Sequence, residues 1–149
     1  MQTFMFYALF EAGDKKGVIV VTFPDVPEAI TEGKGEAEAR AMAEDALGLA
    51  LLSYPERGLP LPKPKAGPKR GRRMEPIAVA PEVAAKLAML GAFAEAKISK
   101  SELARRLRKD EKEVRRLLDP KHATKLQPLS DALRALGKRL VIGVDDIAA

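Results

Sequence analysis

Residues 98–118 constrain the fold of this chain most, because they predict two short helices joined by a tight turn. In the first helix apolar residues recur at helical spacing, and Ser99 or Ser101 can cap its start. In the second helix Asp110 is a candidate N-cap, and Glu113 stands three residues later, as in a capping box. Two such helices are typical of a helix-turn-helix, in which the second helix enters the DNA major groove. The expected core residues of the pair are Leu103, Ala104, Leu107, Val114, Leu117 and Leu118.

The outward faces of these helices carry residues that we expect to contact DNA. On the second helix, Lys112 and Arg115 are the candidates for reading bases. Its first turn is acidic, with Asp110, Glu111 and Glu113, which helps the helix start through its dipole but repels phosphates. The alternative is a small helical bundle whose charged faces are simply solvated. The expected DNA-binding residues are Lys100, Ser101, Lys109, Lys112, Arg115, Arg116, His122 and Lys125.

Charge is distributed unevenly along the chain. Residues 1–54 contain 4 Lys/Arg and 9 Asp/Glu, whereas residues 55–149 contain 22 Lys/Arg and 12 Asp/Glu. The overall net charge of +5 therefore conceals an acidic half and a basic half, which favours two domains with different partners. A basic half supplies the counterion release on which DNA affinity depends.

The N-terminal domain is predicted to be a small α+β layer over residues 1–54. Residues 4–10 and 18–23 form the strands of a β-hairpin, and a short third strand follows around residues 29–32. Residues 36–52 form a helix whose apolar stripe covers the sheet. That stripe consists of Ala39, Ala43, Ala46, Leu47, Ala50 and Leu51.

Residues 55–76 are predicted to be a Pro-rich, basic domain linker. They contain six prolines and several glycines, so they do not form a helix and should be extended or flexible. The simplest interpretation is a solvated tether. The alternative is that residues 69–73 add non-specific phosphate contacts beside the helix-turn-helix. The basic residues of the segment include Lys63, Lys65, Lys69, Arg70, Arg72 and Arg73.

The C-terminal domain, residues 77–149, is predicted to be mostly helical. Residues 77–79 form a short strand, and a helix runs from Pro81 to about Ala96. Another helix covers residues 131–136 and stops at Gly137. Residues 139–144 alternate like a terminal strand, which can pair with residues 77–79 or with its copy in a second subunit. The expected core face of the helix after Pro81 is Val83, Leu87, Leu90 and Ala94.

Several residue types and patterns are missing from the sequence. It has no cysteine, no apolar run of membrane-spanning length and no N-terminal signal pattern, so we expect neither disulfides nor secretion, and a cytoplasmic protein. The single histidine, His122, has no second histidine or cysteine for a zinc site and no nucleophile to serve. We expect it to touch phosphate or cap a helix. No glycine-rich phosphate loop is present, and the sequence predicts no catalytic residue, metal or cofactor.

Six short segments form an ordered pattern along most of the chain. They are Tyr7-Ala8-Leu9-Phe10-Glu11, residues 21–27, Thr31-Glu32-Gly33 before an alanine-rich helix, and residues 99–107, 114–122 and 132–138. In order and spacing they resemble the HicB family of antitoxins. Two departures occur. Glu28-Ala29 stands where many relatives have Gly-Cys, and Arg108 and Lys109 occupy turn positions often filled by glycine and an apolar residue. If Arg108 must take a positive φ, that costs about 1 kcal/mol.

This resemblance implies a fold and a two-part function. In the family the N-terminal half is a partial RNase H-like fold that binds and silences a small HicA-type toxin, an mRNA-cutting ribonuclease. The C-terminal helix-turn-helix represses the operon. Because a toxin that grips RNA is expected to be basic, an acidic N-terminal domain complements it. Candidate toxin-binding residues are Asp25, Glu28 and Glu32, around a proline-bounded bend.

Two other functions stay open. One is a dimeric helix-turn-helix regulator with no toxin partner, whose N-terminal domain senses a small ligand. The other is a metal-dependent nuclease, which needs several carboxylates converging on two divalent ions, and the predicted strands offer little beyond Asp25. Because helix-turn-helix proteins usually read two half-sites, we expect a homodimer or higher homo-oligomer in either regulatory case. The expected partners are therefore operator DNA, a HicA-type toxin and a second copy of the chain, with no membrane.

Overall fold

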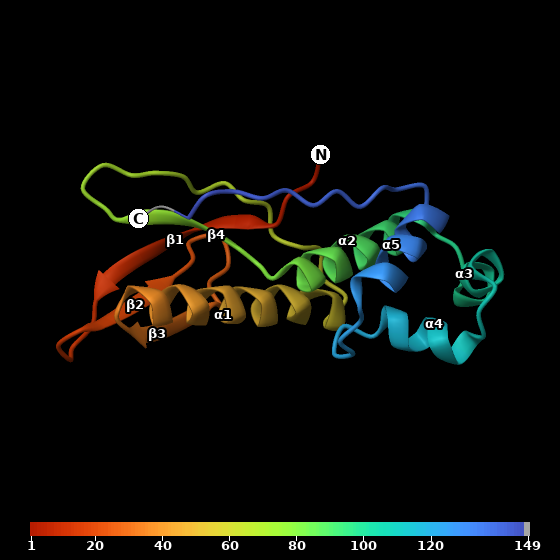
Figure 1. Ribbon diagram of the computed structural model, residues 1–149, viewed down its shortest axis with the longest axis horizontal. Coiled ribbons are helices and arrows are strands. Elements are labelled where there is room, and N and C mark those ends of the chain that lie inside the picture. Colours follow the sequence, from red (N-terminus) through yellow and green to blue (C-terminus); the bar gives the residue numbers. More distant parts are fainter. Residues whose placement is uncertain (148–149) are drawn as a thin grey trace. The chain divides into compact units, whose positions relative to one another are not determined.

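The computed structural model describes residues 1–147 and divides into two compact units, Met1–Ala84 and Ala85–Ala149 (Figure 1). The first unit contains β1 (Met5–Ala12), β2 (Val18–Thr22), β3 (Ile30–Lys34), α1 (Glu36–Glu56) and β4 (Met74–Ala78). Helix α2 (Pro81–Ala96) begins in the first unit and continues into the second, where α3 (Lys100–Leu107), α4 (Glu111–Leu118) and α5 (Leu126–Ala135) follow. The predicted α+β class is confirmed.

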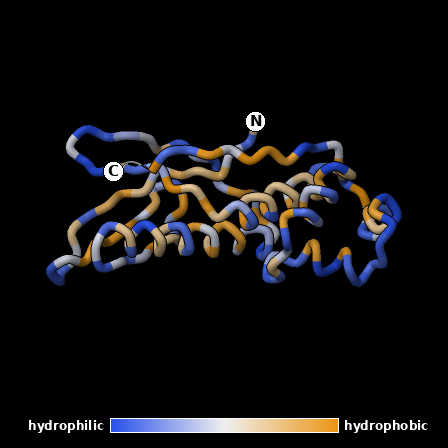
Figure 2. The backbone as a smooth tube through the Cα atoms, in the orientation of Figure 1, coloured by the Kyte–Doolittle hydropathy of each residue, from blue (hydrophilic) through white to orange (hydrophobic). Residues whose placement is uncertain are grey.

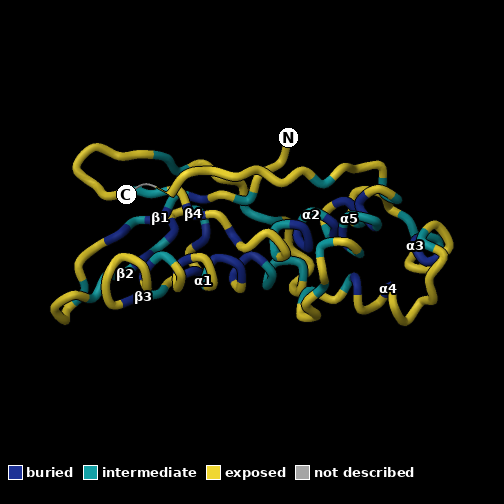
Figure 3. The backbone as a smooth tube through the Cα atoms, in the orientation of Figure 1, coloured by how far each residue is buried: buried dark blue, intermediate teal, exposed yellow. Residues whose placement is uncertain are grey.

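The first unit is built on one antiparallel sheet with the strand order β3-β2-β1-β4. Alternate residues of β1, namely Phe6, Ala8 and Phe10, are buried, so one face of the sheet is apolar. Helix α1 packs on the sheet, and the buried stretches of strands and helix form the core (Figures 1 and 3). The predicted stripe on α1 is buried except for Ala46, which is half-buried.

Gly33 on β3 lies directly under the first turn of α1. A Cβ atom at this position would lie 2.5 Å from the backbone nitrogen of Ala39, closer than two such atoms can approach. The helix therefore sits on the sheet at backbone distance, and only glycine fits beneath it. Gly33 belongs to one of the segments on which the family resemblance is based.

The structure corrects the predicted domain linker. Strand β4 pairs with the outer side of β1, with Met5 opposite Ala78 and Leu9 opposite Met74. Residues 57–73 are thus a loop inside the first unit, hydrophilic at its tip (Figure 2). The boundary between the two units along the chain falls after Ala84 and not near residue 76. Pro76 lies within β4, and it is tolerated there because β4 is an edge strand, where a residue without an N–H can stand. Helix α1 also runs to Glu56, past the predicted end of the domain at residue 54.

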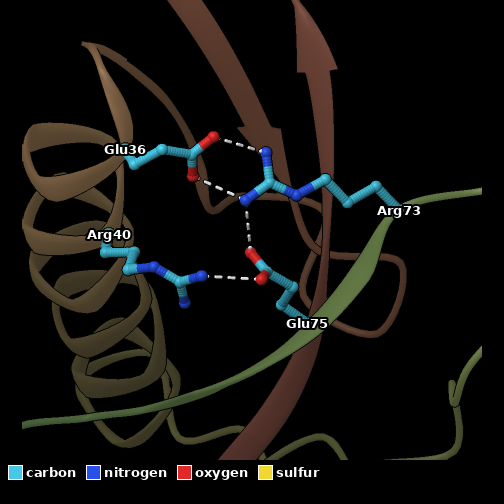
Figure 4. Close-up of polar contacts among 4 residues, drawn as sticks. All are labelled: Glu36, Arg40, Arg73 and Glu75. Carbon is cyan, nitrogen blue, oxygen red and sulfur yellow. Dashed lines mark hydrogen bonds and ion pairs between the residues drawn. The ribbon is translucent and has the colours of Figure 1, made fainter. Parts of the chain in front are cut away.

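A network of ion pairs ties the end of this loop to α1 (Figure 4). The Arg73 guanidinium donates to both carboxylate oxygens of Glu36, at 2.7 and 2.5 Å, and to Glu75 at 3.1 Å. Arg40 donates to the other oxygen of Glu75 at 2.6 Å. Both guanidinium carbons lie over the ring of Phe10, at 4.9 Å for Arg73 and 5.7 Å for Arg40. The end of the basic loop is therefore held against α1.

The second unit packs its helices around two groups of apolar residues. One contains Ala85, Met89 and Ala92 of α2 with residues of α4 and α5, and the other contains Leu103, Ala104 and Val114 of α3 and α4. Four of the six core residues predicted for the α3–α4 pair are buried, and Leu107 and Leu118 are half-buried.

Three expectations for the second unit are corrected. On α2, Ala94 is exposed and Val83 and Leu90 are half-buried, because the helix is apolar nearly all round and periodicity does not define its face. Helix α5 begins at Leu126, before the predicted residue 131. Residues 139–144 form no strand: β4, the expected partner, pairs with β1, and the sheet is completed by β1 to β4 alone.

Candidate nucleic-acid interface and partner-binding surface

Both helices of the α3–α4 pair begin with a side-chain cap. The Ser99 hydroxyl oxygen accepts a hydrogen bond from the backbone N–H of Glu102 at 3.0 Å. The Asp110 carboxylate accepts one from the backbone N–H of Glu113 at 2.8 Å. Each cap satisfies a donor that the helix itself leaves unpaired. The two predicted helix starts are confirmed, with Ser99 as the cap of the first.

Arg108 forms the turn between the two helices in a left-handed conformation, with φ of 54°. Its N–H donates to the carbonyl of Arg105, and the N–H of Lys109 donates to the carbonyl of Ala104. These bonds form the Schellman motif that usually has glycine at this position. Gly137 closes α5 with the same pair of bonds and φ of 78°. The chain thus accepts a cost of about 1 kcal/mol to keep arginine in the turn.

The outward face of α4 is exposed and carries both positively and negatively charged side chains. Lys112, Arg115 and Arg116 are exposed, and so are Glu111 and Glu113. The Arg115 guanidinium lies 3.9 Å from the Glu111 carboxylate. Because that exposed pair is weak, Arg115 can exchange it for a DNA acceptor.

Ser101 at the start of α3 makes a second contact with Glu111. Its hydroxyl donates to the Glu111 carboxylate at 2.5 Å and links the first turns of α3 and α4. Ser101 is therefore placed beside the exposed face of α4.

A hollow of about 150 Å³ brings three of the expected DNA-binding residues together. Lys109, Arg116 and His122 line it, with Glu113 as the acidic member. The side chains of these basic residues are N–H donors, which suit an anion such as a phosphate group. The remaining lining residues are Leu107, Leu117, Thr124 and Pro128.

The other expected DNA-binding residues lie at helix starts. Lys100 is the first residue of α3, and Lys125 precedes the first residue of α5. Both are exposed. All eight expected DNA-binding residues are therefore on the surface, on α3, on α4 and in the segments that flank α4.

Lys86 of α2 is a residue that the sequence-based analysis missed. Its side chain is buried, and its ammonium donates to the carbonyl oxygens of Leu117 at 2.6 Å and Arg116 at 3.3 Å, and to the Thr124 hydroxyl at 3.0 Å. These carbonyls belong to the last turn of α4, where the helix dipole favours a cation. Burial lowers the pKa of Lys86 to about 8, against the opposing charge of Asp119. The signal in the sequence was one lysine in the middle of α2, with only apolar residues and glycine between Glu82 and Glu95 apart from it.

Glu102 orients two arginines on α3. Its carboxylate accepts from Arg105 at 2.6 and 2.8 Å and from Arg106 at 3.1 Å, and these bonds lower the pKa of Glu102 to about 2. Arg106 also donates to the carbonyl of Ala135 at the end of α5, at 3.2 Å. Arg106 therefore joins α3 to α5.

The three candidate toxin-binding residues of the first unit have different surroundings. The Asp25 carboxylate accepts from the backbone N–H groups of Lys65 and Ala66, both at 2.7 Å, and so anchors the middle of the loop 57–73. Glu28 accepts from the Tyr54 hydroxyl at 2.8 Å, which lowers the pKa of Glu28. Glu32 lies exposed on β3, an outer strand of the sheet.

The structural boundary also changes the charge of each unit. The loop 57–73 contains seven Lys/Arg and no Asp/Glu, and it belongs to the first unit. Residues 1–84 consequently contain 11 Lys/Arg and 12 Asp/Glu, whereas residues 85–149 contain 15 and 9. The second unit is basic as expected, but the acidic residues of the first unit are nearly balanced by its own loop.

Two kinds of feature are absent from the part of the chain that the structure describes. No helix in residues 1–147 combines the length and apolar composition that crossing a membrane requires. Across the same part of the chain, no three His, Asp or Glu side chains come together in a group able to hold a metal ion.

The similarity of this chain to known proteins extends over both the α+β unit and the basic helical unit. It is 40% identical over 127 residues to Antitoxin HicB of Escherichia coli K12, covering 84% of this chain and 88% of that protein. It is 36% identical over 133 residues to Antitoxin HicB 1 of Photorhabdus laumondii, covering 88% and 81%. Antitoxin HicB of Pseudomonas fluorescens Pf0-1 is 30% identical over 141 residues, 95% of each chain. No family model matches the sequence. The chain belongs to the HicB family of antitoxins, and the resemblance stated above is confirmed.

Proposed function

We propose that this protein is an antitoxin that neutralises a HicA-type mRNA interferase and represses its own operon. The first unit binds the toxin, and the second unit binds operator DNA through a helix-turn-helix formed by α3 and α4. The observation that carries this proposal is the similarity to antitoxins of the HicB family, which extends over 84–95% of the chain and hence over both units.

Three features of the second unit support DNA binding. The unit is basic, so it gains affinity from counterion release. The α4 helix presents Lys112 and Arg115 on its exposed face, where a recognition helix carries its base contacts. Arg116, Lys109 and His122 line a hollow at the side of α4, where they are placed to hold the phosphate backbone.

For toxin binding by the first unit, the support comes from individual exposed carboxylates and not from the acidic net charge that the sequence predicted. Because the basic loop balances most of the acidic residues, complementarity to a basic toxin depends on where the exposed carboxylates lie and not on net charge. Of the three candidates, Glu32 is exposed on an outer strand, whereas Asp25 and Glu28 each hold another part of the unit in place. We therefore favour the β3 side of the sheet as the toxin-binding surface. The sheet and α1 constitute the partial RNase H-like fold of the proposal.

The protein acts, in this proposal, as a cytoplasmic homodimer without catalytic activity, metal or cofactor. Two copies place two α4 helices on two half-sites of an operator. Neutralisation needs only that the antitoxin covers the RNA-binding surface of the toxin.

Co-expression tests the proposal directly. The full chain, tagged, is expressed with the short open reading frame beside its gene, and both co-purification and rescue of growth are scored. Rescue with co-purification is the expected result. A shift of an operator fragment, but not of a scrambled fragment, tests the second half. No complex and no toxicity, with specific DNA binding retained, indicates a regulator without a toxin partner.

A further inference from the structure

A cavity in the first unit plays no part in the proposed function. Its volume is about 420 Å³, and the N-terminal segment, α1 and the loop 57–73 all contribute to its walls. Phe6 and Leu51, which are 2% and 0% exposed, line it from the core of the unit. A cavity of this size with a mostly apolar lining and a few polar groups is typical of a small-molecule site.

The wall that the loop contributes is held at both ends. The N–H of Leu59 donates to the carbonyl of Tyr54 at 2.9 Å. The Asp25 carboxylate accepts from the N–H groups of Lys65 and Ala66, both at 2.7 Å. Between these anchors the loop contains three prolines, whose rings restrict the backbone. The wall is therefore fixed, and we expect the cavity to keep its volume in solution.

The opposite wall belongs to the N-terminal segment and is held by the sheet. The carbonyl of Phe4 accepts from the N–H of Val79 at 3.3 Å, and the next residue of the segment pairs with β4. Phe4 on this wall and Leu61 on the loop wall are both half-buried. An apolar ligand between them removes their remaining apolar surface from water, which favours binding.

The only charged side chain that lines the cavity is a lysine. Lys63 is exposed and forms no hydrogen bond or ion pair with another side chain of residues 1–147. Lys65 follows two residues later, and the loop 57–73 contains no Asp or Glu. The charge of this region therefore suits a ligand with an anionic group, to which an ammonium donates strong hydrogen bonds. A cationic ligand is disfavoured for the same reason.

We propose that the first unit binds a small amphipathic carboxylate, with the size and chemistry of a medium-chain fatty acid, in this cavity. The apolar chain of the ligand lies between Phe4 and Leu61, over a floor formed by Phe6 and Leu51. Its carboxylate accepts a hydrogen bond from the Lys63 ammonium. This site goes beyond the proposed antitoxin function and does not rest on toxin or DNA binding.

The first experiment uses the dye anilinonaphthalene sulfonate, which combines an apolar body with one anionic group and fluoresces when it leaves water. A titration of the folded full chain with the dye should show saturable binding. Decanoate, below the concentration at which it forms micelles, should displace the dye. Decylammonium has the same chain length and the opposite charge, and it should displace the dye at least about tenfold less well.

Two matched pairs of variants locate the binding. Leu61→Trp fills the cavity and should raise the dissociation constant of decanoate at least about tenfold. Leu59→Trp makes the same change at a residue that is 45% exposed and does not line the cavity, so it should have no effect. Lys63→Glu should raise the constant about fivefold, as expected for reversing one exposed charge. Lys69→Glu, in the same loop but outside the lining, is its control. Circular dichroism checks that each variant is folded.

Three results would overturn the proposal. They are a wild-type chain that shows no saturable dye binding, equal displacement by decanoate and decylammonium, and a Leu61→Trp variant that binds decanoate as the wild type does. If decanoate does not bind and Leu61→Trp abolishes co-purification with the toxin, a protein covers the cavity, and the proposal is also wrong. The dye assay contains neither toxin nor DNA, so failure of the co-expression or operator assays leaves its result intact.

Discussion

The Lys86 ammonium lies 2.6 Å from the carbonyl oxygen of Leu117, so a buried cation on α2 holds the end of α4. The same ammonium reaches Thr124 in the segment that leads to α5. Lys86 therefore sets the position of the exposed basic residues that flank this end of α4, Arg116 and His122, without reaching the surface itself.

Replacing Lys86 with methionine keeps the length of the side chain but removes its three donors. Two carbonyls and a hydroxyl then lose their partner in a buried site, which should lower the free energy of unfolding by about 1–3 kcal/mol. Urea unfolding followed by circular dichroism measures the change. Lys97→Met, at an exposed position, is the control and should have no comparable effect. Equal stability of the Lys86→Met and wild-type proteins contradicts the anchoring role.

The lowered pKa of Lys86 predicts a dependence of stability on pH. Folding lowers this pKa from 10.5 to about 8, so between these pH values the unfolded chain binds more protons than the folded chain. The free energy of unfolding contributed by this group must then rise with pH across that window. Comparing the wild type with Lys86→Met at pH 8 and above isolates the effect. An NMR titration of the lysine side chains should show one lysine titrating near pH 8, and its absence would falsify the assignment.

Arg108 and Gly137 offer a matched pair of substitutions at two Schellman turns. Arg108→Gly relieves a left-handed conformation and should raise the free energy of unfolding by about 0.5–1 kcal/mol. Gly137→Ala imposes the same conformation on a side chain and should lower it by about 1 kcal/mol. Thermal unfolding of both variants tests the pair, and changes of the same sign in the two would contradict the explanation.

Asp25 should control access to the loop 57–73. Asp25→Ala removes the acceptor of two backbone N–H groups at Lys65 and Ala66, so the middle of the loop should open. Limited trypsin digestion should then cut after Lys65 faster than in the wild type, with the α5 region cut at an unchanged rate. Glu32→Ala removes the same charge from an exposed strand position and should leave the cleavage rate unchanged.

Lys112 and Arg115 should carry sequence preference if α4 reads bases. Replacing both with alanine should cost about 1–3 kcal/mol of operator affinity for each lost base contact and reduce the ratio of operator to random DNA affinity. Lys109→Ala with Arg116→Ala should instead weaken both DNAs alike and reduce the dependence of affinity on salt. If the first double variant weakens all sequences evenly, Lys112 and Arg115 contact phosphates.

The local structure of α3 and α4 was predictable from the sequence because its causes are local. Ser99 and Asp110 each accept a hydrogen bond from the backbone N–H three residues later in the chain. The helical spacing of apolar residues places Leu103 and Val114 in the core. The hairpin of β1 and β2 was predictable for the same reason. The eight expected DNA-binding residues are all exposed, but the hydrogen bonds that Asp25 and Glu28 make inside the first unit were not predicted.

The sequence by itself determined the elements with a strong period and clear caps, the basic character of the second unit and the family. Only the tertiary structure decided where β4 pairs, which face of α2 is buried and what Lys86 does. Strand pairing over a loop as long as residues 57–73 depends on which edge is free, and the face of a helix that is apolar all round depends on its neighbours. The buried ammonium of Lys86 is stable only because it donates hydrogen bonds to carbonyls at the end of α4, which is distant in the sequence. No local sequence pattern predicts that contact.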